Sequence, residues 1–197
     1  MNASLATIAA AAGLFAGTNL DDLVVLAVLN ASSRAGGRPK KWQIWAGQYA
    51  GVSVLTGISV AAALGLTLVP ENWIWTLGLV PLGLGVRKLI VAIRACGSGK
   101  HGRQAVVNGL AGVIGLTIAN GGDNIAVYTP VFRTLGAGRI AVTVAVFAAG
   151  VAVWCLAGYW LVSHQTVTEV LERYSQWIIP AVYIAIGLYI IAKSGVL

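Results

Sequence analysis

The chain has 197 residues, of which 58% are hydrophobic and 10% are charged, and its net charge is +7. Soluble domains carry about 25% charged residues, so this composition excludes an ordinary soluble enzyme or binding domain and predicts an all-α integral membrane protein. The basic residues cluster in short connections between apolar runs, which favours contact with anionic lipid over nucleic-acid binding.

A helix needs about 20 mostly apolar residues to cross a bilayer, and six stretches of the sequence qualify. They cover residues 4–30, 42–69, 73–93, 105–132, 138–163 and 175–193. The first has no positive charge ahead of it and is too long for a signal-peptide core, so we expect a mature helix. Turns are expected at 34–41, 70–72, 96–103 and 136–138. Polar residues 163–174 are expected to leave the membrane, with a short surface helix there.

Lys and Arg are distributed unequally between the two ends of these spans. Ten lie in or beside the first, third and fifth connections: Arg34, Arg38, Lys40, Lys41, Arg87, Lys88, Arg94, Lys100, Arg103 and Arg173. The opposite side holds Arg133, Arg139 and Lys193. Because basic residues are enriched in cytoplasmic loops, this predicts that both termini are extracytoplasmic.

Two acidic motifs indicate an internal repeat. Residues 18–26 (TNLDDLVVL) resemble residues 119–128 (ANGGDNIAVY), and Pro81 and Pro180 stand at nearly the same offset. Each half would hold three spans, and because three is odd the second half would insert the other way up. The sequence therefore predicts a single transmembrane domain of two inverted three-helix repeats, about 1–95 and 104–197.

Three of the six acids, Asp21, Asp22 and Asp123, fall inside predicted spans. A charge at the bilayer centre costs about 2.5–3.5 kcal/mol on insertion scales, so it usually has a partner or a function. No Lys or Arg lies near these acids in the sequence, so we expect protonation, a bound cation, or both in alternation. Gly121 and Gly122 let the backbone bend, which is tolerated at that depth beside a cavity or packed protein.

The candidate metal ligands are all oxygen atoms. They belong to Asp21, Asp22, Asp123, Asn19, Asn120 and Asn124, with Thr18, Thr117 and Gln48 as weaker candidates. Such a shell suits a divalent ion such as Mg²⁺, Mn²⁺ or Ca²⁺. Asp22 projects about 100° away from Asp21 around a helix, so which of the two faces the site stays open. Hydrogen bonding between helices is the structural alternative, but it explains three aspartates poorly.

Other patterns predict close contacts between helices or argue against a disulfide framework and enzymatic activity. Glycines in the second and third spans predict close helix contacts: Gly47, Gly51, Gly57, Gly78, Gly83 and Gly85. Cys96 and Cys155 do not suggest a disulfide framework. The sequence has no P-loop, HExxH, GxSxG or CxxC motif, so we expect neither an enzyme nor a bound cofactor.

Four segments resemble the bacterial cadmium-resistance transporter family, which belongs to the LysE-type superfamily of six-span exporters. They are TNLDDLVVL (18–26), GQYAG (47–51), LGLVPLGLG (77–85) and TIANGGDNIAVYTPVF (117–132), and the resemblance covers roughly residues 5–193. It implies export of a divalent cation across the bacterial plasma membrane, with the acidic motifs of the first and fourth spans as the ion site. Whether the ion is Cd²⁺, Zn²⁺, Mn²⁺ or Mg²⁺ stays open.

The expected function is therefore secondary export of a divalent metal ion by proton antiport. The missing nucleotide-binding motif favours a gradient-driven mechanism, with hinges at Gly121-Gly122 and around Asn19. The alternatives are an amino-acid exporter of the same superfamily, which would need an anion pocket, and a non-transporting membrane scaffold. The expected partners are the metal ion, protons and lipid, and a homo-oligomer is left open.

Overall fold

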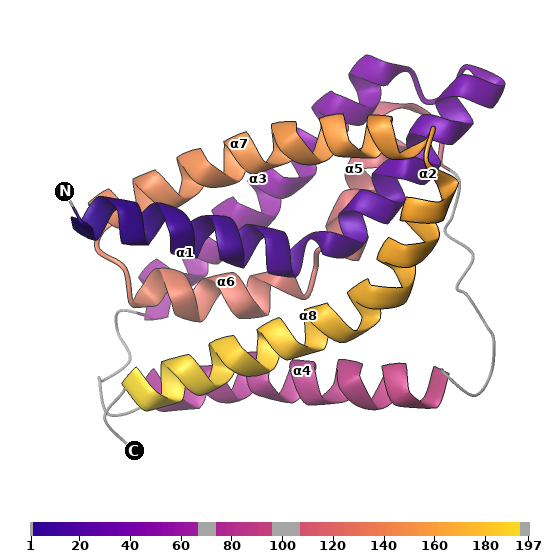
Figure 1. Ribbon diagram of the computed structural model, residues 1–197. Helices are drawn as coiled ribbons and strands as arrows, with labels where there is room; N and C mark the ends of the chain where they lie inside the picture. Colours follow the sequence, from indigo (N-terminus) through magenta and orange to yellow (C-terminus); the bar gives the residue numbers. More distant parts are fainter. Residues whose placement is uncertain (1, 67–73, 96–106, 194–197) are drawn as a thin grey trace.

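The computed structural model describes residues 2–66, 74–95 and 107–193, and this part of the chain forms eight helices (Figure 1). They are α1 Asn2–Thr18, α2 Leu20–Gly36, α3 Lys41–Gly65, α4 Ile74–Ala95, α5 Gly109–Asn120, α6 Asn124–Arg133, α7 Ala137–Leu161 and α8 Gln165–Lys193. The turn predicted at 70–72 and the basic loop at 96–103, with Cys96, lie outside the described residues.

Two of the predicted spans are each broken into a pair of helices. The α1 and α2 axes differ by 59° across Asn19, and the α5 and α6 axes differ by 67° across residues 121–123. The backbone thus bends where the acidic motifs predicted it. Four further helices are long and apolar enough to cross a membrane, which makes up to six crossings if each bent pair counts as one. The protein is therefore a multi-pass helical membrane protein.

The last helix corrects one expectation. Residues 163–174 do not form a separate surface helix, because α8 runs without a break from Gln165 to Lys193. The reason lies in the sequence, since no Gly or Pro occurs between residues 165 and 179 to end a helix. Pro180 lies inside α8 and does not end it.

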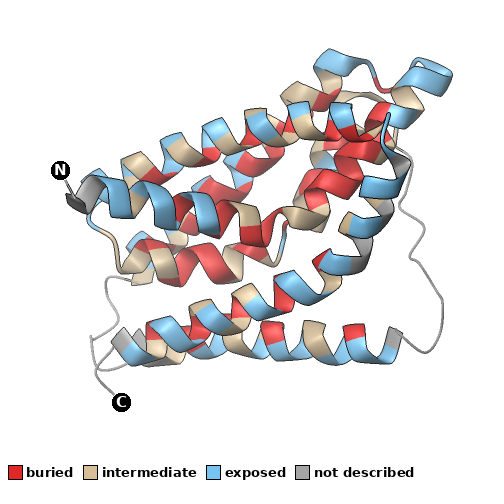
Figure 2. Ribbon diagram, viewed as in Figure 1, coloured by how far each residue is buried: buried red, intermediate tan, exposed pale blue. Residues whose placement is uncertain are grey.

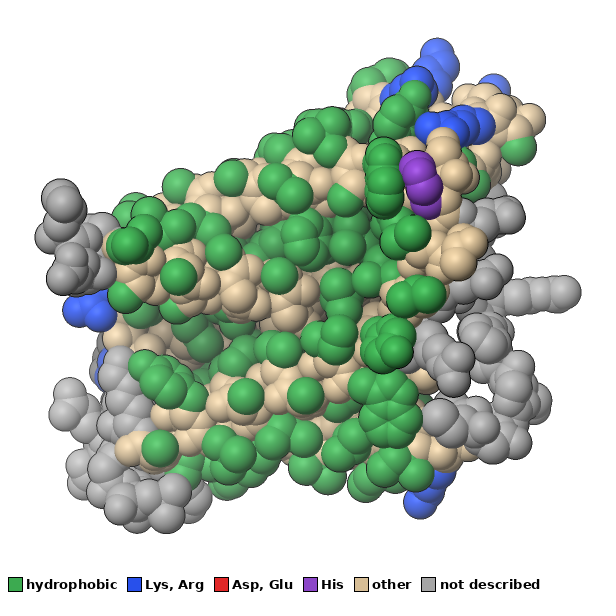
Figure 3. Space-filling view, in the orientation of Figure 1, with side chains coloured by type: hydrophobic (Ala, Val, Ile, Leu, Met, Phe, Trp, Pro, Cys, Tyr) green, Lys and Arg blue, Asp and Glu red, His purple; other side chains and the backbone are tan. Residues whose placement is uncertain are grey.

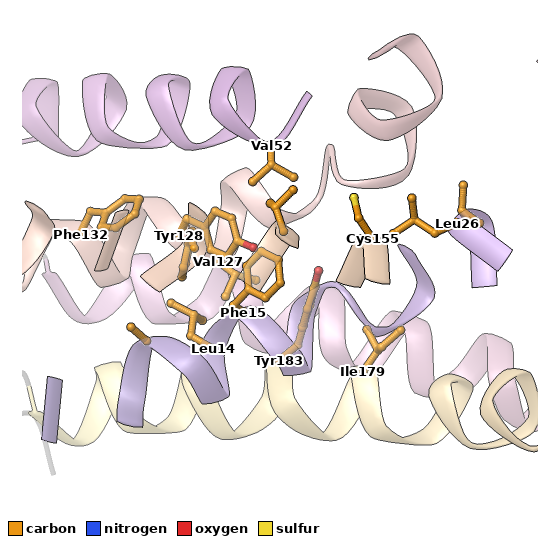
Figure 4. Close-up of a cluster of buried hydrophobic side chains, with 14 of the residues drawn as sticks. Leu14, Phe15, Leu26, Val52, Val127, Tyr128, Phe132, Cys155, Ile179 and Tyr183 are labelled. Atoms are coloured by element: carbon orange, nitrogen blue, oxygen red, sulfur yellow. The ribbon is translucent and has the colours of Figure 1, made fainter. Parts of the chain in front are cut away.

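The helices pack as two groups that meet at the broken spans. α8 lies along α4, while α3 contacts α5, α6 and α7, and α7 also covers α1 and α2 (Figure 1). Aromatic rings fill the centre, where the ring centroids of Tyr128 and Phe147 are 4.9 Å apart and those of Phe15 and Phe147 are 5.4 Å apart. Figure 4 shows Tyr183 projecting from α8 toward this cluster. α1 begins and α8 ends at the same end of the bundle.

The outer surface is apolar, as a lipid-facing surface requires. Buried residues concentrate around α2, α3 and α6, whereas α4 is largely exposed (Figure 2). On the face drawn in Figure 3, hydrophobic side chains cover the middle of the molecule and the blue Lys and Arg side chains lie toward its edges.

Only some of the predicted glycine contacts are present. A Cβ at Gly47 or Gly51 would meet side chains of α5, and one at Gly78 or Gly85 would meet the backbone of α8, in each case at 3.0 Å or less. Gly57 and Gly83 were expected to make such contacts too, but no atom of another helix lies within 4 Å of a Cβ at either position. The close contact of α4 with α8 therefore depends on Gly78 and Gly85 but not on Gly83.

We expect Gly85→Ala to destabilise the protein by about 1–3 kcal/mol, the range typical of overpacking. The added methyl would lie 2.9 Å from the backbone nitrogen of Ile184 and 3.0 Å from the carbonyl oxygen of Pro180, and backbone atoms cannot move aside alone. Thermal unfolding of the purified protein measures the loss. Gly83→Ala is the matched control, and equal melting temperatures for the two variants would contradict this packing.

Candidate functional site

The acidic residues begin the second helix of each broken span. Asp21 and Asp22 lie in the first turn of α2, and Asp123 is the residue that caps the start of α6. A helix N-terminus carries a partial positive charge that stabilises a nearby carboxylate. Each break is thus followed at once by acidic side chains, two inside the first turn of α2 and one at the N-cap of α6.

Asp22 is held on all sides by protein. Its side chain is 2% exposed, and its two carboxylate oxygens accept hydrogen bonds from Asn120 Nδ2 at 2.5 Å and Gln48 Nε2 at 3.0 Å. Thr117 Oγ1 donates to Gln48 Oε1 at 2.9 Å, which fixes the orientation of that amide. Asp22 therefore joins α2 to α3 and α5, and Gln48, a weaker candidate in the sequence, is one of its two side-chain donors.

Asp21 and Asp123 line a separate space. Both carboxylates border a cavity of about 500 Å³ between α4 and α8, together with Lys88 and Ser175. Asp21 also interacts electrostatically with Asp22, Asp123 and Lys88. Acids from both broken spans therefore border one cavity.

The expectation that these acids lack a basic neighbour is wrong for Asp123. Lys88 Nζ forms an ion pair with Asp123 Oδ2, and the two side chains are 32% and 23% exposed. The same ammonium lies 5.0 Å from the ring centroid of Tyr183. Lys88 was assigned to the cytoplasmic end of a span, but α4 continues for seven residues beyond it to Ala95. The cavity is therefore bordered by two acidic residues, Asp21 and Asp123, and two basic residues, Lys88 and Arg87, with Asp22 behind them.

The remaining polar residues form a buried network that joins the two breaks. Tyr128 OH contacts Thr18 Oγ1 at 2.9 Å and accepts a hydrogen bond from Asn19 Nδ2 at 2.7 Å. Asn124 Nδ2 donates to Asn19 Oδ1 at 3.2 Å, and Tyr183 OH donates to Asn124 Oδ1 at 2.8 Å. Here the amide oxygens of Asn19 and Asn124 accept hydrogen bonds from protein, and their role as metal ligands stays a prediction.

The break at Asn19 has its own support from α7. Trp154 Nε1 donates a 2.6 Å hydrogen bond to the backbone carbonyl of Asn19, and its ring packs edge-on against Phe15. Asn19 Nδ2 also donates to the carbonyl of Phe15 at 2.8 Å, near the end of α1. Both bonds involve carbonyls near the end of α1, where the last groups of a helix lack helical partners.

We expect Trp154→Phe to lower the free energy of unfolding by about 1 kcal/mol, because it keeps an aromatic ring but removes this donor. Thermal unfolding of the purified protein in detergent measures the change. Trp177→Phe, at an exposed position of α8, is the control. An unchanged melting temperature for Trp154→Phe would show that the bond does not support the break.

The structure thus separates the predicted ligands into three places. Asp21 and Asp123 line the cavity, Asp22 is held by Asn120 and Gln48, and the other amide residues belong to the network. Among the described residues, no group of three His, Cys, Asp or Glu side chains is placed to hold one metal ion. An ion in the cavity would therefore need further oxygen ligands, from amides, backbone or water.

Three residues of the site were missed by the sequence analysis. Lys88 was counted only for topology, and Tyr128 and Tyr183 were not singled out. A signal existed for each, because a lysine followed by five apolar residues lies deep in a span, and a buried tyrosine hydroxyl needs a hydrogen-bond partner.

A second cavity lies toward the opposite end of the bundle. It has a volume of about 690 Å³ and is bordered by Leu14 of α1, Val131 of α6, Arg139 of α7 and Val182 of α8. Along α1, α6 and α8, the residues of the buried network lie close to or between those that line the two cavities. The network therefore lies beside the acidic cavity and beside this second, mostly apolar cavity.

Comparisons with known proteins give one match. No curated protein and no solved structure matches the chain significantly. The family described as cadmium resistance transporter matches residues 15–197, which include both broken spans and every residue of the acidic cavity. The chain therefore belongs to the cadmium resistance transporter family.

Proposed function

We propose that this membrane transporter, which by its family is not an enzyme, exports a divalent metal ion from the cytoplasm in exchange for protons. The observation that carries the proposal is that Asp21 and Asp123, from the two broken spans, line one cavity. Interrupted helices that bring ligands to the middle of the bundle are the usual ion sites of secondary transporters.

The chemistry of the cavity fits a divalent cation. Two carboxylates face the space, and Asp22 adds negative charge behind them. Cadmium accepts oxygen ligands, and so do Zn²⁺, Mn²⁺ and Mg²⁺. Cys155 is buried in α7 and is not among the residues that line this cavity. The ion would therefore be bound by oxygen.

We further propose that residues 1–95 and 104–197 are two inverted repeats, with both termini outside the cytoplasm. In support, each half contains one broken span at its acidic motif, bent by 59° and 67°. The helices that follow, α3 and α7, are both 25 residues long, and the last helices, α4 and α8, pack together. The common end at which α1 begins and α8 ends agrees with an even number of crossings.

In this arrangement the acidic cavity lies in the half of the bundle that the positive charges assign to the cytoplasm. The ion would enter there, between α4 and α8, and would leave through the apolar cavity after the buried network separates. The bends at Asn19 and at Gly121-Gly122 are the points where the broken spans would change angle. Protons would replace the metal ion on the carboxylates for the return step.

Reconstituted protein in liposomes tests the proposal. With Cd²⁺ on one side, we expect an opposing proton gradient to accelerate metal flux and the flux to move protons in the other direction. A metal-sensitive dye and a pH-sensitive dye report the two movements together. Metal flux that neither moves protons nor responds to the gradient would contradict exchange, and absent flux would contradict transport.

One observation keeps the amino-acid exporter as a second candidate. Lys88 places an ammonium beside the carboxylates, and a zwitterionic amino acid needs both charges in its site. The family match favours the metal ion. Binding of lysine or threonine, without competition by divalent cations, would reverse this preference.

A further inference from the structure

We propose that Lys88 is a tethered cation: its ammonium occupies the Asp123 part of the site when no metal ion is bound, and the transported ion displaces it. The inference rests on the proposed function and assigns to this site an internal competitor. Lys88 would thereby set the affinity of the site for the metal ion. It would also help the metal-free protein to return to the state that opens to the cytoplasm.

The position of the ammonium carries the argument. Lys88 Nζ contacts the carboxylate of Asp123 inside the cavity that Asp21 also lines. Lys88 Nζ contacts Asp123 Oδ2, the oxygen that a metal ion held by both oxygen atoms of this carboxylate would also need. Two positive charges cannot both approach one carboxylate closely without strong repulsion, which is weakly screened inside a protein. Binding of the metal through Oδ2 and the Lys88–Asp123 contact therefore compete with each other.

The lysine has the means to move aside. Its ammonium is a compact charge on a flexible four-carbon stem, and the cavity of about 500 Å³ gives it space. The ring of Tyr183, whose centroid is 5.0 Å from Nζ, offers a cation–π contact that does not require Asp123. A displaced ammonium can therefore remain in the cavity without a new ion pair.

The pair also has a consequence for the empty protein. Without a metal ion, three carboxylates would be left in the membrane interior, where charges are costly. Lys88 neutralises one of them, and the proposed protons would neutralise the others. Without the ammonium, one more carboxylate charge would have to be neutralised before the metal-free protein could return to the state that opens to the cytoplasm.

An ordinary structural ion pair predicts something different. If Lys88 only stabilised the fold, its loss would weaken metal binding and every mode of transport together. A tethered competitor predicts that its loss strengthens metal binding. It also predicts that net transport falls while exchange of bound metal for metal continues, because exchange never requires the empty protein to return.

The experiment compares the purified full chain with Lys88→Gln, Lys88→Arg and Arg94→Gln, using Cd²⁺ alone as the probe. Arg94→Gln removes one charge from an exposed position of the same helix and is the matched control. Calorimetry should show Cd²⁺ binding at least about tenfold tighter for Lys88→Gln, a difference of about 1.4 kcal/mol. Lys88→Arg and Arg94→Gln should bind as the wild type does.

Transport in liposomes provides the second measurement. We expect Lys88→Gln to exchange radioactive Cd²⁺ for unlabelled Cd²⁺ at a rate near that of the wild type, but to reduce net flux at least about tenfold. Lys88→Arg should restore net flux, which a misfolded variant could not explain. Unchanged or weaker binding by Lys88→Gln, or parallel loss of exchange and net flux, would overturn the inference while the proposed function stands. Absence of binding and flux in the wild type would overturn both.

Discussion

Asp123→Asn is expected to reduce Cd²⁺ binding at least about 100-fold and to abolish metal resistance in a host cell. The substitution keeps the size of the side chain and removes its charge. Loss of a group that merely hydrogen-bonds to a metal ligand lowers affinity by about 10–100-fold, and loss of a charged ligand should exceed that range. Asp123 also faces Lys88, so the neutral amide would leave the ammonium without its partner.

Calorimetry on purified protein and growth of cells across a range of Cd²⁺ concentrations measure this effect. Glu71→Gln removes a charge from the turn that the sequence predicts between two spans, and should leave both measurements unchanged. Equal resistance in cells carrying Asp123→Asn and the wild type, at equal protein levels, would mean that Asp123 is not a ligand.

Asp22→Ala is expected to destabilise the folded protein, whereas Asp21→Ala is expected to weaken metal binding with little effect on stability. Asp22 accepts hydrogen bonds from Gln48 and Asn120, and each buried donor left unpaired costs about 1–3 kcal/mol. Asp21 borders the cavity and accepts the backbone N–H of Asp22. Water in the cavity can replace that acceptor.

Thermal unfolding of the two variants separates these roles. We expect the melting temperature of Asp22→Ala to fall by roughly 5–10 °C, with a much smaller change for Asp21→Ala. Cd²⁺ binding should weaken in both. If Asp21→Ala proves as unstable as Asp22→Ala, the cavity-lining role assigned to Asp21 is wrong.

The broken spans and their acids could be predicted from sequence because the signal is local. A run such as Asn120-Gly121-Gly122-Asp123 in an apolar stretch is unfavourable in a regular membrane helix, so it predicts a bend and a polar surrounding wherever the helix lies. Asn19 beside Asp21 and Asp22 carries the same information in the first half.

The partners of these acids could not be predicted because they depend on how helices pack. Lys88 lies on α4, far in sequence from Asp123, and counting it with the basic residues of the loops hid its depth in the span. The separate roles of Asp21 and Asp22 follow from the rotation of α2 against α3 and α5. Hydrophobic periodicity does not specify such a rotation when one side of a helix faces lipid and the other faces protein.

The glycines also show that the sequence does not specify which side of a helix packs against its neighbour. Gly83 and Gly85 are two residues apart in one helix and look alike in sequence, yet only Gly85 touches α8. The continuity of α8 was also missed, because polarity was taken to end a membrane helix. A helix can continue into water when no residue interrupts it.

The hydrogen bond from Asn124 to Asn19 means that the two broken spans share one buried contact. If either span straightened alone, Asn19 Oδ1 and Asn124 Nδ2 would lose this bond in an interior that offers little water to replace it. Half-open states are therefore disfavoured, and the molecule should switch as a unit. In the proposed exchange of metal ions for protons, such switching would limit the passage of protons without a metal ion crossing in return.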